Sequence, residues 1–291
     1  RLVPVGPAPA AASPTPAAAP EATTLDEGMV GARFRLGARL GGSRTGDVRA
    51  GSDATPHQDC VVKLIPPAVL ANPLVTQRTE RELKQLQKVA SDRVCRVIEF
   101  GKHGQHLWIA MELAHGGPLD RLVTAAGGRL PPERARRLAA EIGEGLAEAA
   151  KIGVIHRDVA PKNVLVGAGD RVKIINFSVA VPVSDRIQGI PEFLSPEQAE
   201  GKPVDQRSSI YSLAALLYYM ITGVPPFSGD AQAVVQAHLH TPPLPPGQRA
   251  QGLAVPPELE RTIMKGLDKN SSRRHLTLRQ MLGEIDAAAG G

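Results

Sequence analysis

Two short runs of the sequence contain the polar residues best placed to do chemistry. The first is HRDVAPKNVLV, from His156 to Val166, which brings an acid, Asp158, close to an amide, Asn163. The second is VKIINFSVA, from Val172 to Ala180, whose apolar, strand-like first part delivers Asn176 to the start of an irregular segment. If the two runs form one site, Asn176 stands where an acid would be expected.

The elements that must position these residues fall into two groups. From Phe34 to Leu64, short apolar runs broken by Gly, Ser and Asp predict strands joined by hairpins. Residues 74–89 carry charged and apolar residues at helical spacing, and two more strands are expected at 96–100 and 106–113. A Gly-rich connection follows the last strand, and we expect the boundary between two lobes there.

Beyond that connection, helices dominate the pattern. Leu138, Ile142 and Leu146 lie four residues apart within a predicted helix at 135–150, which begins after two prolines and stops before Gly153. The run at 210–220 is apolar nearly all round, so it predicts a central buried helix. Further helices are expected near residues 231–238, 257–267 and 278–288.

Composition limits the classes of domain and partner. The chain has 291 residues, of which 42% are hydrophobic, enough for the core of one two-lobed domain. Residues 1–28 are rich in Ala and Pro with few large apolar side chains, so they predict a disordered linker. The net charge is +5, but basic and acidic residues are interspersed and only 3% of residues are aromatic. We therefore expect no nucleic-acid partner.

The cysteines and the apolar runs indicate a cytoplasmic setting. Cys60 and Cys95 lie far apart without a CxxC pattern, so neither a disulfide framework nor a zinc site is expected. The longest apolar run, 213–221, is too short to cross a bilayer, and the N-terminus lacks the apolar part of a signal peptide. Membrane contact is expected only through segments outside this chain, as in the cytosolic domain of a membrane protein.

The order of the motifs along residues 33–288 resembles that of a protein kinase, closest in style to bacterial Ser/Thr kinases. A lone match would be unspecific, whereas a whole series in the right order is specific. The resemblance implies an α+β, two-lobed protein-kinase fold. Its β-rich N-lobe would occupy residues 29–115, and its helical C-lobe would occupy residues 116–291.

The small lobe carries the residues that the resemblance assigns to ATP. Lys63 matches the strand lysine that pairs the phosphates, and Glu82, nineteen residues later, matches its ion-pair partner on the helix. Gly41 and Gly46 match the glycine-rich loop, whereas Ser43 replaces that loop's middle glycine. Val61 replaces the small residue that usually lies beside adenine. Met111 matches the gatekeeper, and the hinge is formed by Glu112, Leu113 and Ala114.

The first polar run matches the catalytic loop of the family. By this resemblance Asp158 is the base that orients the substrate hydroxyl, and Asn163 is a metal ligand. Ala160 replaces the lysine expected two residues after the base. Lys162, two residues further on, is a candidate to supply part of that missing charge.

Other positions depart from the family pattern. Asn176 begins the sequence that replaces Asp-Phe-Gly, whose carboxylate would bridge Mg²⁺, and an amide offers only one neutral oxygen. Ile190 replaces the threonine of the substrate channel, and Ser209 replaces an aspartate that ties down the catalytic loop. No Thr lies between Asn176 and Glu197, in a segment shorter than the family norm. Glu197 and Arg274 retain the pair that anchors the large lobe.

These departures predict a catalytically impaired kinase domain, a pseudokinase, that acts as a regulatory protein-interaction module and needs no cofactor. Two alternatives stay open. One is a weakly active Ser/Thr kinase using ATP and Mg²⁺, favoured by the retained Lys63, Glu82, Asp158 and Asn163. The other is a nucleotide-binding switch without turnover.

The Ala/Pro-rich lead-in and the altered motifs also resemble the cytosolic kinase-like domain of actinobacterial peptidoglycan-precursor flippases. That resemblance implies two protein partners, an active Ser/Thr kinase that phosphorylates the domain and a forkhead-associated reader of phosphothreonine. Thr241, beside a Pro-rich loop, and Thr277, at the start of the last predicted helix, are the candidate phosphosites.

Overall fold

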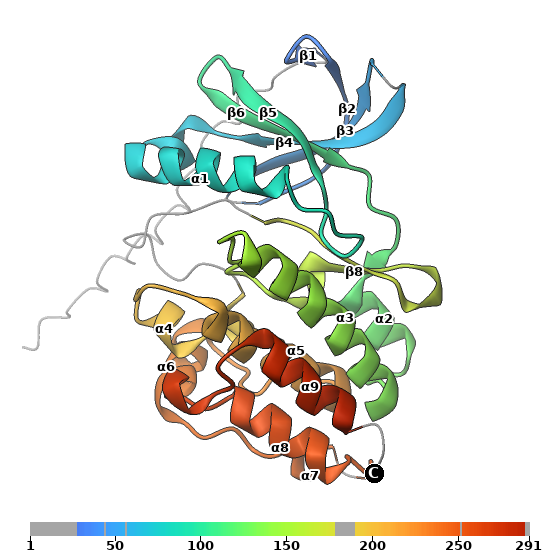
Figure 1. Cartoon of the computed structure of the whole chain (residues 1–291), viewed down its shortest axis with the longest axis vertical. Helices are drawn as coiled ribbons and strands as arrows, with labels where there is room; N and C mark the ends of the chain where they lie inside the picture. The colour runs from blue at the N-terminus through green and yellow to red at the C-terminus, as the bar shows by residue number, and fades with distance from the viewer. Residues whose placement is uncertain (1–27, 44, 56, 178–189, 251, 289–291) are drawn as a thin grey trace, which may run out of the picture.

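The structure, a computed structural model, describes most of the chain, namely residues 28–43, 45–55, 57–177, 190–250 and 252–288. The chain folds into a sheet-rich N-terminal lobe and a helical C-terminal lobe (Figure 1), which confirms the expected fold class. The predicted linker falls almost wholly on residues 1–27, outside the described residues.

The N-lobe is built on a six-stranded antiparallel sheet with spatial order β1-β2-β3-β4-β6-β5. Side chains alternate between its faces. On β4, Cys60, Val62 and Leu64 join an outer apolar cluster with Trp108, whereas Lys63 points to the opposite face, toward the C-lobe. The bounds are β1 Met29–Val30, β2 Phe34–Ser43, β3 Gly46–Asp53, β4 Gln58–Ile65, β5 Val97–His103 and β6 His106–Glu112.

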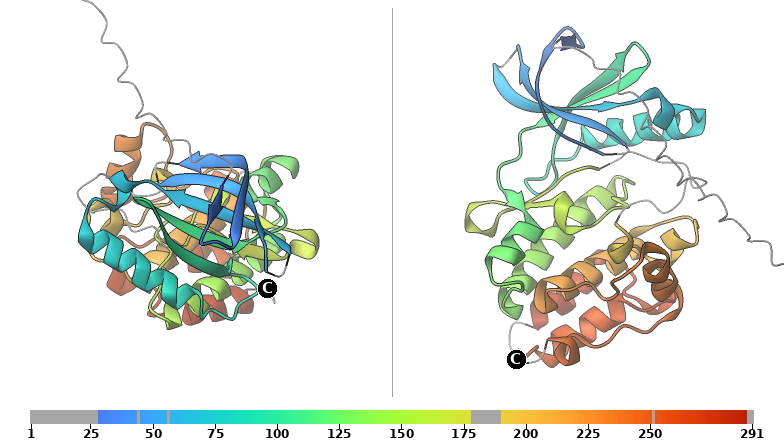
Figure 2. Two further views of the ribbon diagram at one scale, coloured as in Figure 1. Left: turned by 90° about the horizontal axis from the view of Figure 1, so that it is seen from above. Right: turned by 180° about the vertical axis from the view of Figure 1, so that it is seen from behind.

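One helix, α1 (Pro73–Leu86), lies along the inner face of this sheet, as the two views of Figure 2 also show. It begins at Asn72, whose side chain accepts a hydrogen bond from the Leu74 N–H, with Pro73 in the first turn. Its buried face includes Leu83 and the carboxylate of Glu82. The helix predicted at 74–89 is therefore present and ends three residues earlier.

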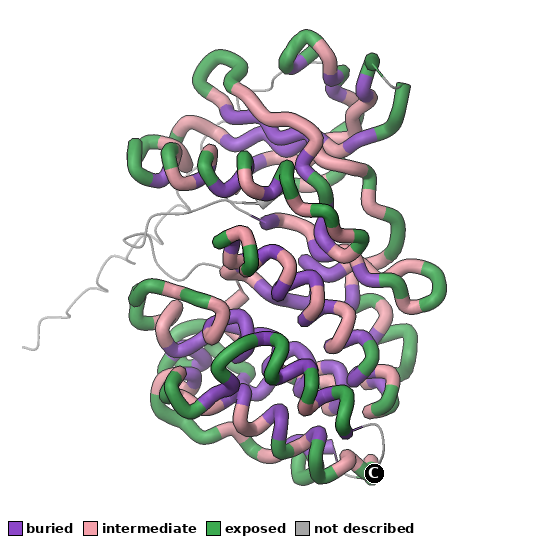
Figure 3. The backbone as a smooth tube through the Cα atoms, viewed as in Figure 1, coloured by how far each residue is buried: buried purple, intermediate pink, exposed green. Residues whose placement is uncertain are grey.

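The C-lobe packs its helices around α5 (Gln206–Thr222), which is buried on nearly every side and confirms the predicted central helix (Figures 1 and 3). Helices α3 (Pro132–Lys151) and α9 (Leu278–Ala287) pack against each other and against α5. The other helices are α2 Leu119–Ala125, α4 Pro196–Ala199, α6 Ala231–His240, α7 Pro246–Arg249 and α8 Pro257–Gly266, with short 3-10 turns at Pro67–Leu70, Pro161–Asn163, Ala168–Asp170, Pro191–Phe193 and Ser271–Arg273.

A small sheet at the junction of the lobes carries the two polar runs. Its strands are β7 (Gly117–Pro118), β8 (Val164–Val166) and β9 (Val172–Ile174), all antiparallel. The inner apolar cluster continues through this junction, because it joins Ile65 and Leu83 of the N-lobe to Ile174 and Leu146 of the C-lobe.

Both cysteines are buried free thiols. Cys60 lies in the outer cluster of the N-lobe, and burial raises the pKa of its thiol to about 11. Cys95 lies at the junction, with Sγ 3.7 Å from the Glu112 carbonyl oxygen, and burial raises the pKa of its thiol to about 12. Among the described residues, no helix is both long and apolar enough to span a membrane.

Candidate functional site

The hairpin of β8 and β9 brings the two polar runs together. Val164 lies opposite Ile174 in this hairpin, and both side chains are buried in the core. Just beyond it, the Ile175 N–H donates to the Asn163 carbonyl oxygen at 2.9 Å. The residues predicted to share one site therefore do so.

Three side chains form a chain of hydrogen bonds, which we call the amide chain: Asn176, Asn163 and Asp158. The Asn176 amide nitrogen donates to Asn163 Oδ1 at 2.9 Å. The Asn163 amide nitrogen donates to Oδ2 and to the carbonyl oxygen of Asp158, both at 2.8 Å. Asp158 Oδ1 accepts from the Ile190 N–H at 3.2 Å. Both oxygens of the expected catalytic base are thus engaged within the protein.

The chemistry of the partners fixes the direction of the amide chain. An ionised carboxylate and a carbonyl only accept, so Asn163 must turn its NH₂ toward Asp158 and its oxygen toward Asn176. Asn176 must then present its own NH₂. The Asn163 oxygen that the resemblance assigned to a metal accepts the Asn176 N–H in this arrangement. Asn176 offers no anionic oxygen, the ligand that Mg²⁺ prefers.

His156 stabilises the catalytic loop through hydrogen bonds of its ring. Its Nδ1 accepts from the Asp158 N–H at 3.2 Å, so the ring proton is on Nε2, which donates to the Ile175 carbonyl oxygen at 2.8 Å. The ring of Phe177 packs edge-on at 4.4 Å between centroids. Burial lowers the pKa of His156, in keeping with a neutral, structural ring.

Lys63 reaches the site from β4 and is only 5% exposed. Burial disfavours its charged form and lowers its pKa to about 8, while the negative charge of Asp158 opposes part of that shift. Asp158, the expected base, is therefore the acid whose negative charge favours the charged form of Lys63.

Glu82 does not pair with Lys63, so the predicted ion pair is wrong for the described structure. Arg157 of the catalytic loop holds both carboxylate oxygens of Glu82, at 2.7 and 2.9 Å, and Arg78 adds a contact at 3.1 Å. Burial alone would raise the pKa of Glu82, but these guanidinium groups pull it below its ordinary value. A planar guanidinium matches a carboxylate with two parallel bonds, which the compact ammonium of Lys63 cannot do.

The glycine-rich hairpin keeps one glycine for a structural reason. Gly46 has φ = 135°, and a Cβ there would lie 2.1 Å from the Leu64 carbonyl oxygen, so no other residue fits. A Cβ at Gly41 would meet no atom within 4 Å. Val61 lies opposite Met111 across β4 and β6, and both are half-buried.

The hinge is fastened at its first residue. Glu112 accepts from Lys173 Nζ at 2.7 Å and from the Arg96 N–H at 3.0 Å, while the Leu113 side chain is exposed. Lys162 is also exposed and lies in the turn between Asp158 and β8, and its side chain is not one of the three that form the amide chain. The structure thus leaves Lys162 outside the group of side chains that it brings together.

Two residues of the site were missed from sequence. Gln198 donates to the Arg157 carbonyl oxygen at 2.7 Å, so it fastens the catalytic loop. Its position three residues after Ser195 forms a capping box that the sequence could have revealed. Arg78 lies four residues before Glu82, a spacing typical of helical ion pairs.

The anchor of the large lobe is present as predicted. Arg274 binds Glu197 through two bonds of 2.8 and 2.9 Å, and Ser208 donates to the same carboxylate at 2.6 Å. Arg274 is 3% exposed. Ser209, in the position of the lost aspartate, is buried.

Comparisons with known proteins agree with this architecture. A family model described as the protein kinase domain matches residues 34–283. The serine/threonine-protein kinase PknB of Mycobacterium leprae is 32% identical over 266 residues, which cover 87% of this chain and 42% of that protein. The serine/threonine-protein kinase pkn2 of Myxococcus xanthus is 31% identical over 284 residues, covering 93% of this chain and 33% of that protein. This chain therefore spans less than half of these relatives.

Among solved structures, the PknI kinase domain of Mycobacterium tuberculosis superimposes with a TM-score of 0.75 and 22% sequence identity. The match covers 91% of this chain and the whole of that one. At this identity the likeness establishes the fold alone.

Proposed function

The chain belongs to the protein kinase family, and from this premise we propose that it is a kinase domain with impaired phosphoryl transfer that serves as a regulatory, protein-binding module. One observation carries the proposal: the Asn176 amide nitrogen lies 2.9 Å from Asn163 Oδ1. In an active kinase the residues at these two positions would hold a metal ion that neutralises phosphate charge, whereas here one amide donates a hydrogen bond to the other. Loss of one preorganised electrostatic group costs about 3 kcal/mol of transition-state stabilisation, roughly a hundredfold in rate.

The position of Glu82 supports the same proposal. An active kinase needs its strand lysine paired with the helix glutamate, so that the ammonium is held toward the phosphates. Here Glu82 is held by Arg157 and Arg78, and Lys63 lies within the field of Asp158. Both departures weaken the same step, the positioning and neutralisation of phosphate charge.

A second candidate is a weakly active Ser/Thr kinase that uses ATP and Mg²⁺. Its support comes from the relatives, which are named serine/threonine-protein kinases, and from the retained Lys63, Asp158 and Asn163. The comparisons favour this candidate more directly than they favour impairment, because none of the proteins reported above is named as inactive. The proposal of impairment rests on the residues of the amide chain.

Transfer of labelled phosphate from ATP, with Mg²⁺ or Mn²⁺, separates the two candidates. The wild-type chain is expected to incorporate no more phosphate than an Asp158→Ala variant. Incorporation that proceeds with time in the wild type and disappears in the variant would establish the weakly active kinase instead.

The partners of such a module are proposed from the resemblance: an active Ser/Thr kinase acting in trans and a forkhead-associated phosphothreonine reader. Of the two candidate phosphosites, Thr277 is exposed and caps the start of α9, where the helix dipole favours a phosphate. Thr241 is exposed at the end of α6, where the dipole disfavours one. Attachment to a flippase would come through segments outside this chain.

Phosphosite mapping by mass spectrometry, after incubation with an active bacterial Ser/Thr kinase, tests this part. We expect phosphate on Thr277, and reader binding that is lost in Thr277→Val and kept in Thr241→Val. Reader binding that is indifferent to phosphate would leave a phosphate-independent scaffold.

A further inference from the structure

A cavity of about 490 Å³ lies in the C-lobe, apart from the amide chain. It is bounded by the last turns of α3, by the segment that leads into the catalytic loop, and by the first residues of α5 and α9. None of the residues of the amide chain lines it. It is partly open to solvent, and its volume lies within the range of small-molecule sites, about 300–1,000 Å³.

The inner wall of the cavity is apolar and made partly of small side chains. Helix α3 contributes Ala147 and Ala150, and Ile155 and Leu278 face the same space. Ala147 and Leu278 are buried. Two alanines on this side of α3 leave room that longer side chains would fill, so the wall can receive an apolar group.

Two cations border the same cavity, Lys151 at the end of α3 and Arg279 in the first turn of α9. Lys151 forms no ion pair with the part of the chain that the structure describes. Among the described residues, Arg279 forms one ion pair, with the carboxylate of Glu144 at 3.8 Å, and its side chain is 60% exposed. Neither positive charge is closely matched by a partner.

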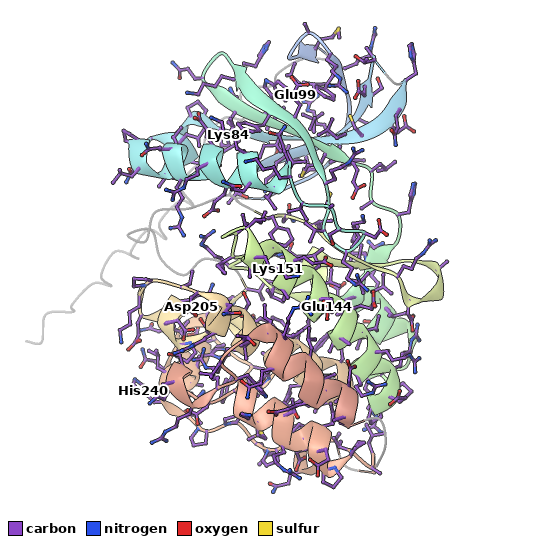
Figure 4. All side chains as sticks on the ribbon, viewed as in Figure 1. Lys84, Glu99, Glu144, Lys151, Asp205 and His240 are labelled. Carbon is purple, nitrogen blue, oxygen red and sulfur yellow. The ribbon has the colours of Figure 1, made fainter. Side chains whose placement is uncertain are left out.

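One acid, Asp205, also borders the cavity. Its Oδ1 accepts from the Arg207 N–H at 2.7 Å, because Asp205 caps the start of α5. Figure 4 labels Lys151 and Asp205 on the same side of the C-lobe, on the ends of two different elements. The cavity lining therefore has two positively charged side chains and one carboxylate, and that carboxylate is already hydrogen-bonded to the start of α5.

We propose that this cavity binds a small organic anion, a carboxylate or a phosphate monoester carried on an apolar body. The anionic end lies between Lys151 and Arg279, and the apolar body lies against Ala147, Ala150 and Leu278. The proposal goes beyond the function proposed above and does not depend on the state of the amide chain.

Four probes separate the two halves of the ligand: hexanoate, hexyl phosphate, hexanol and inorganic phosphate. Titration into the whole chain, followed by methyl NMR of Ile155 and Ala147, is expected to give saturable shifts with hexanoate or hexyl phosphate. Hexanol and inorganic phosphate are each expected to bind at least about tenfold more weakly, since each lacks one half of the contacts. The stronger of the first two identifies the anionic group.

Charge-reversal variants locate the site. Lys151→Glu and Arg279→Glu are each expected to weaken hexanoate or hexyl phosphate by about tenfold or more. Arg273→Glu, an equal charge change at an exposed residue outside the cavity lining, is the control and is expected to bind as the wild type does. Equal binding by all four proteins, shifts that never saturate, or hexanol binding as well as hexanoate would each overturn the proposal.

Discussion

At the scale of single residues, Asn176 places a neutral amide where protein kinases have the carboxylate of an aspartate. Its φ is 64°, in the left-handed region, which asparagine tolerates better than most side chains do. Aspartate at the same position would keep the backbone geometry but would offer no N–H to Asn163 Oδ1. Two oxygens would then face each other, and that arrangement calls for a cation between them.

Asn176→Asp is therefore expected to create metal dependence. Without metal it should lose about 1 kcal/mol of stability, the value of one hydrogen bond. With Mg²⁺ and ATP in excess, its melting temperature should rise by roughly 5 °C or more, because ligand that binds the native state stabilises it. The wild type and Asn72→Asp, the same change at the exposed cap of α1, should show no such rise. A similar Mg²⁺-dependent rise in the wild type would show that the amide chain does not exclude metal.

Lys63 makes a testable contribution to the pH dependence of stability. Its pKa falls from 10.5 in the unfolded chain to about 8 in the folded one. Between these values the unfolded chain binds more protons, so Lys63 makes the free energy of unfolding rise with pH from 8 to 10.5. Below pH 8 the buried charge lowers stability by about 3 kcal/mol.

Lys63→Met is the variant that isolates this effect. Urea unfolding of the two proteins should show the variant more stable below pH 8, with the difference shrinking toward pH 10.5. Lys269, whose pKa burial also lowers to about 8, titrates in both proteins and cancels in the comparison. A difference that does not change with pH would mean that the pKa of Lys63 is the same in the folded and the unfolded chain.

The resemblance to a protein kinase predicted that Asp158, Asn163 and Asn176 would meet, because it assigns the first two to the catalytic loop and Asn176 to a metal-binding position of the same site. The partner of Glu82 was a different matter. The resemblance gave Lys63 as that partner, whereas Arg157 and Arg78 hold Glu82 in the structure, and the choice among these three cations depends on how far α1 lies from each lobe. Only the packed structure decides that.

At the scale of elements, Glu82 fastens α1 to the catalytic loop. Arg157 and Glu82 come from different lobes, and their side chains are only 12% and 7% exposed. Replacing one member of such a buried pair leaves a charge without a partner. The contact therefore sets the position of α1 as well as contributing to stability.

Glu82→Gln is expected to lower the free energy of unfolding by about 3 kcal/mol. Glu80→Gln is the control on the same helix. Glu80 meets Lys102 at 3.4 Å with both side chains substantially exposed, so its loss should cost less than about 1 kcal/mol. Equal losses in urea unfolding would show that the bonds to Arg157 contribute no more than a surface pair.

Apolar patterning predicted the long elements, since α3, α8 and α9 each carry an apolar stripe at helical spacing and α5 is apolar nearly all round. It did not predict α2 (Leu119–Ala125), which buries only Leu119 and Val123, or the four-residue helices α4 and α7. Elements of one or two turns contain too few apolar positions to show a period. They form because neighbouring elements cover them, which local sequence does not encode.

At the scale of the whole molecule, the two lobes share one apolar cluster. Ile65 and Leu83 of the N-lobe belong to the same cluster as Ile174 and Leu146 of the C-lobe. The outer cluster of the sheet, with Trp108, is separate but lies on the other face of the same strands. Neither lobe therefore has a complete core without the other.

We expect the lobes to unfold together. Trp108, the one tryptophan of the chain, reports the outer cluster of the N-lobe by fluorescence, whereas far-UV circular dichroism reports mainly the C-lobe helices. The two urea transitions should coincide. A fluorescence change at lower urea than the circular dichroism change would show that the N-lobe opens alone.

The two buried thiols are natural chemical probes of partial opening of the chain. Only a thiolate reacts with a disulfide reagent, and both thiols are shielded and hard to ionise in the folded state. Cys60 reacts only when the outer face of the sheet is uncovered, and Cys95 only when the hinge side of the junction separates. The modification rates of Cys60 and Cys95 therefore report how often two different parts of the same molecule open. No label has to be introduced.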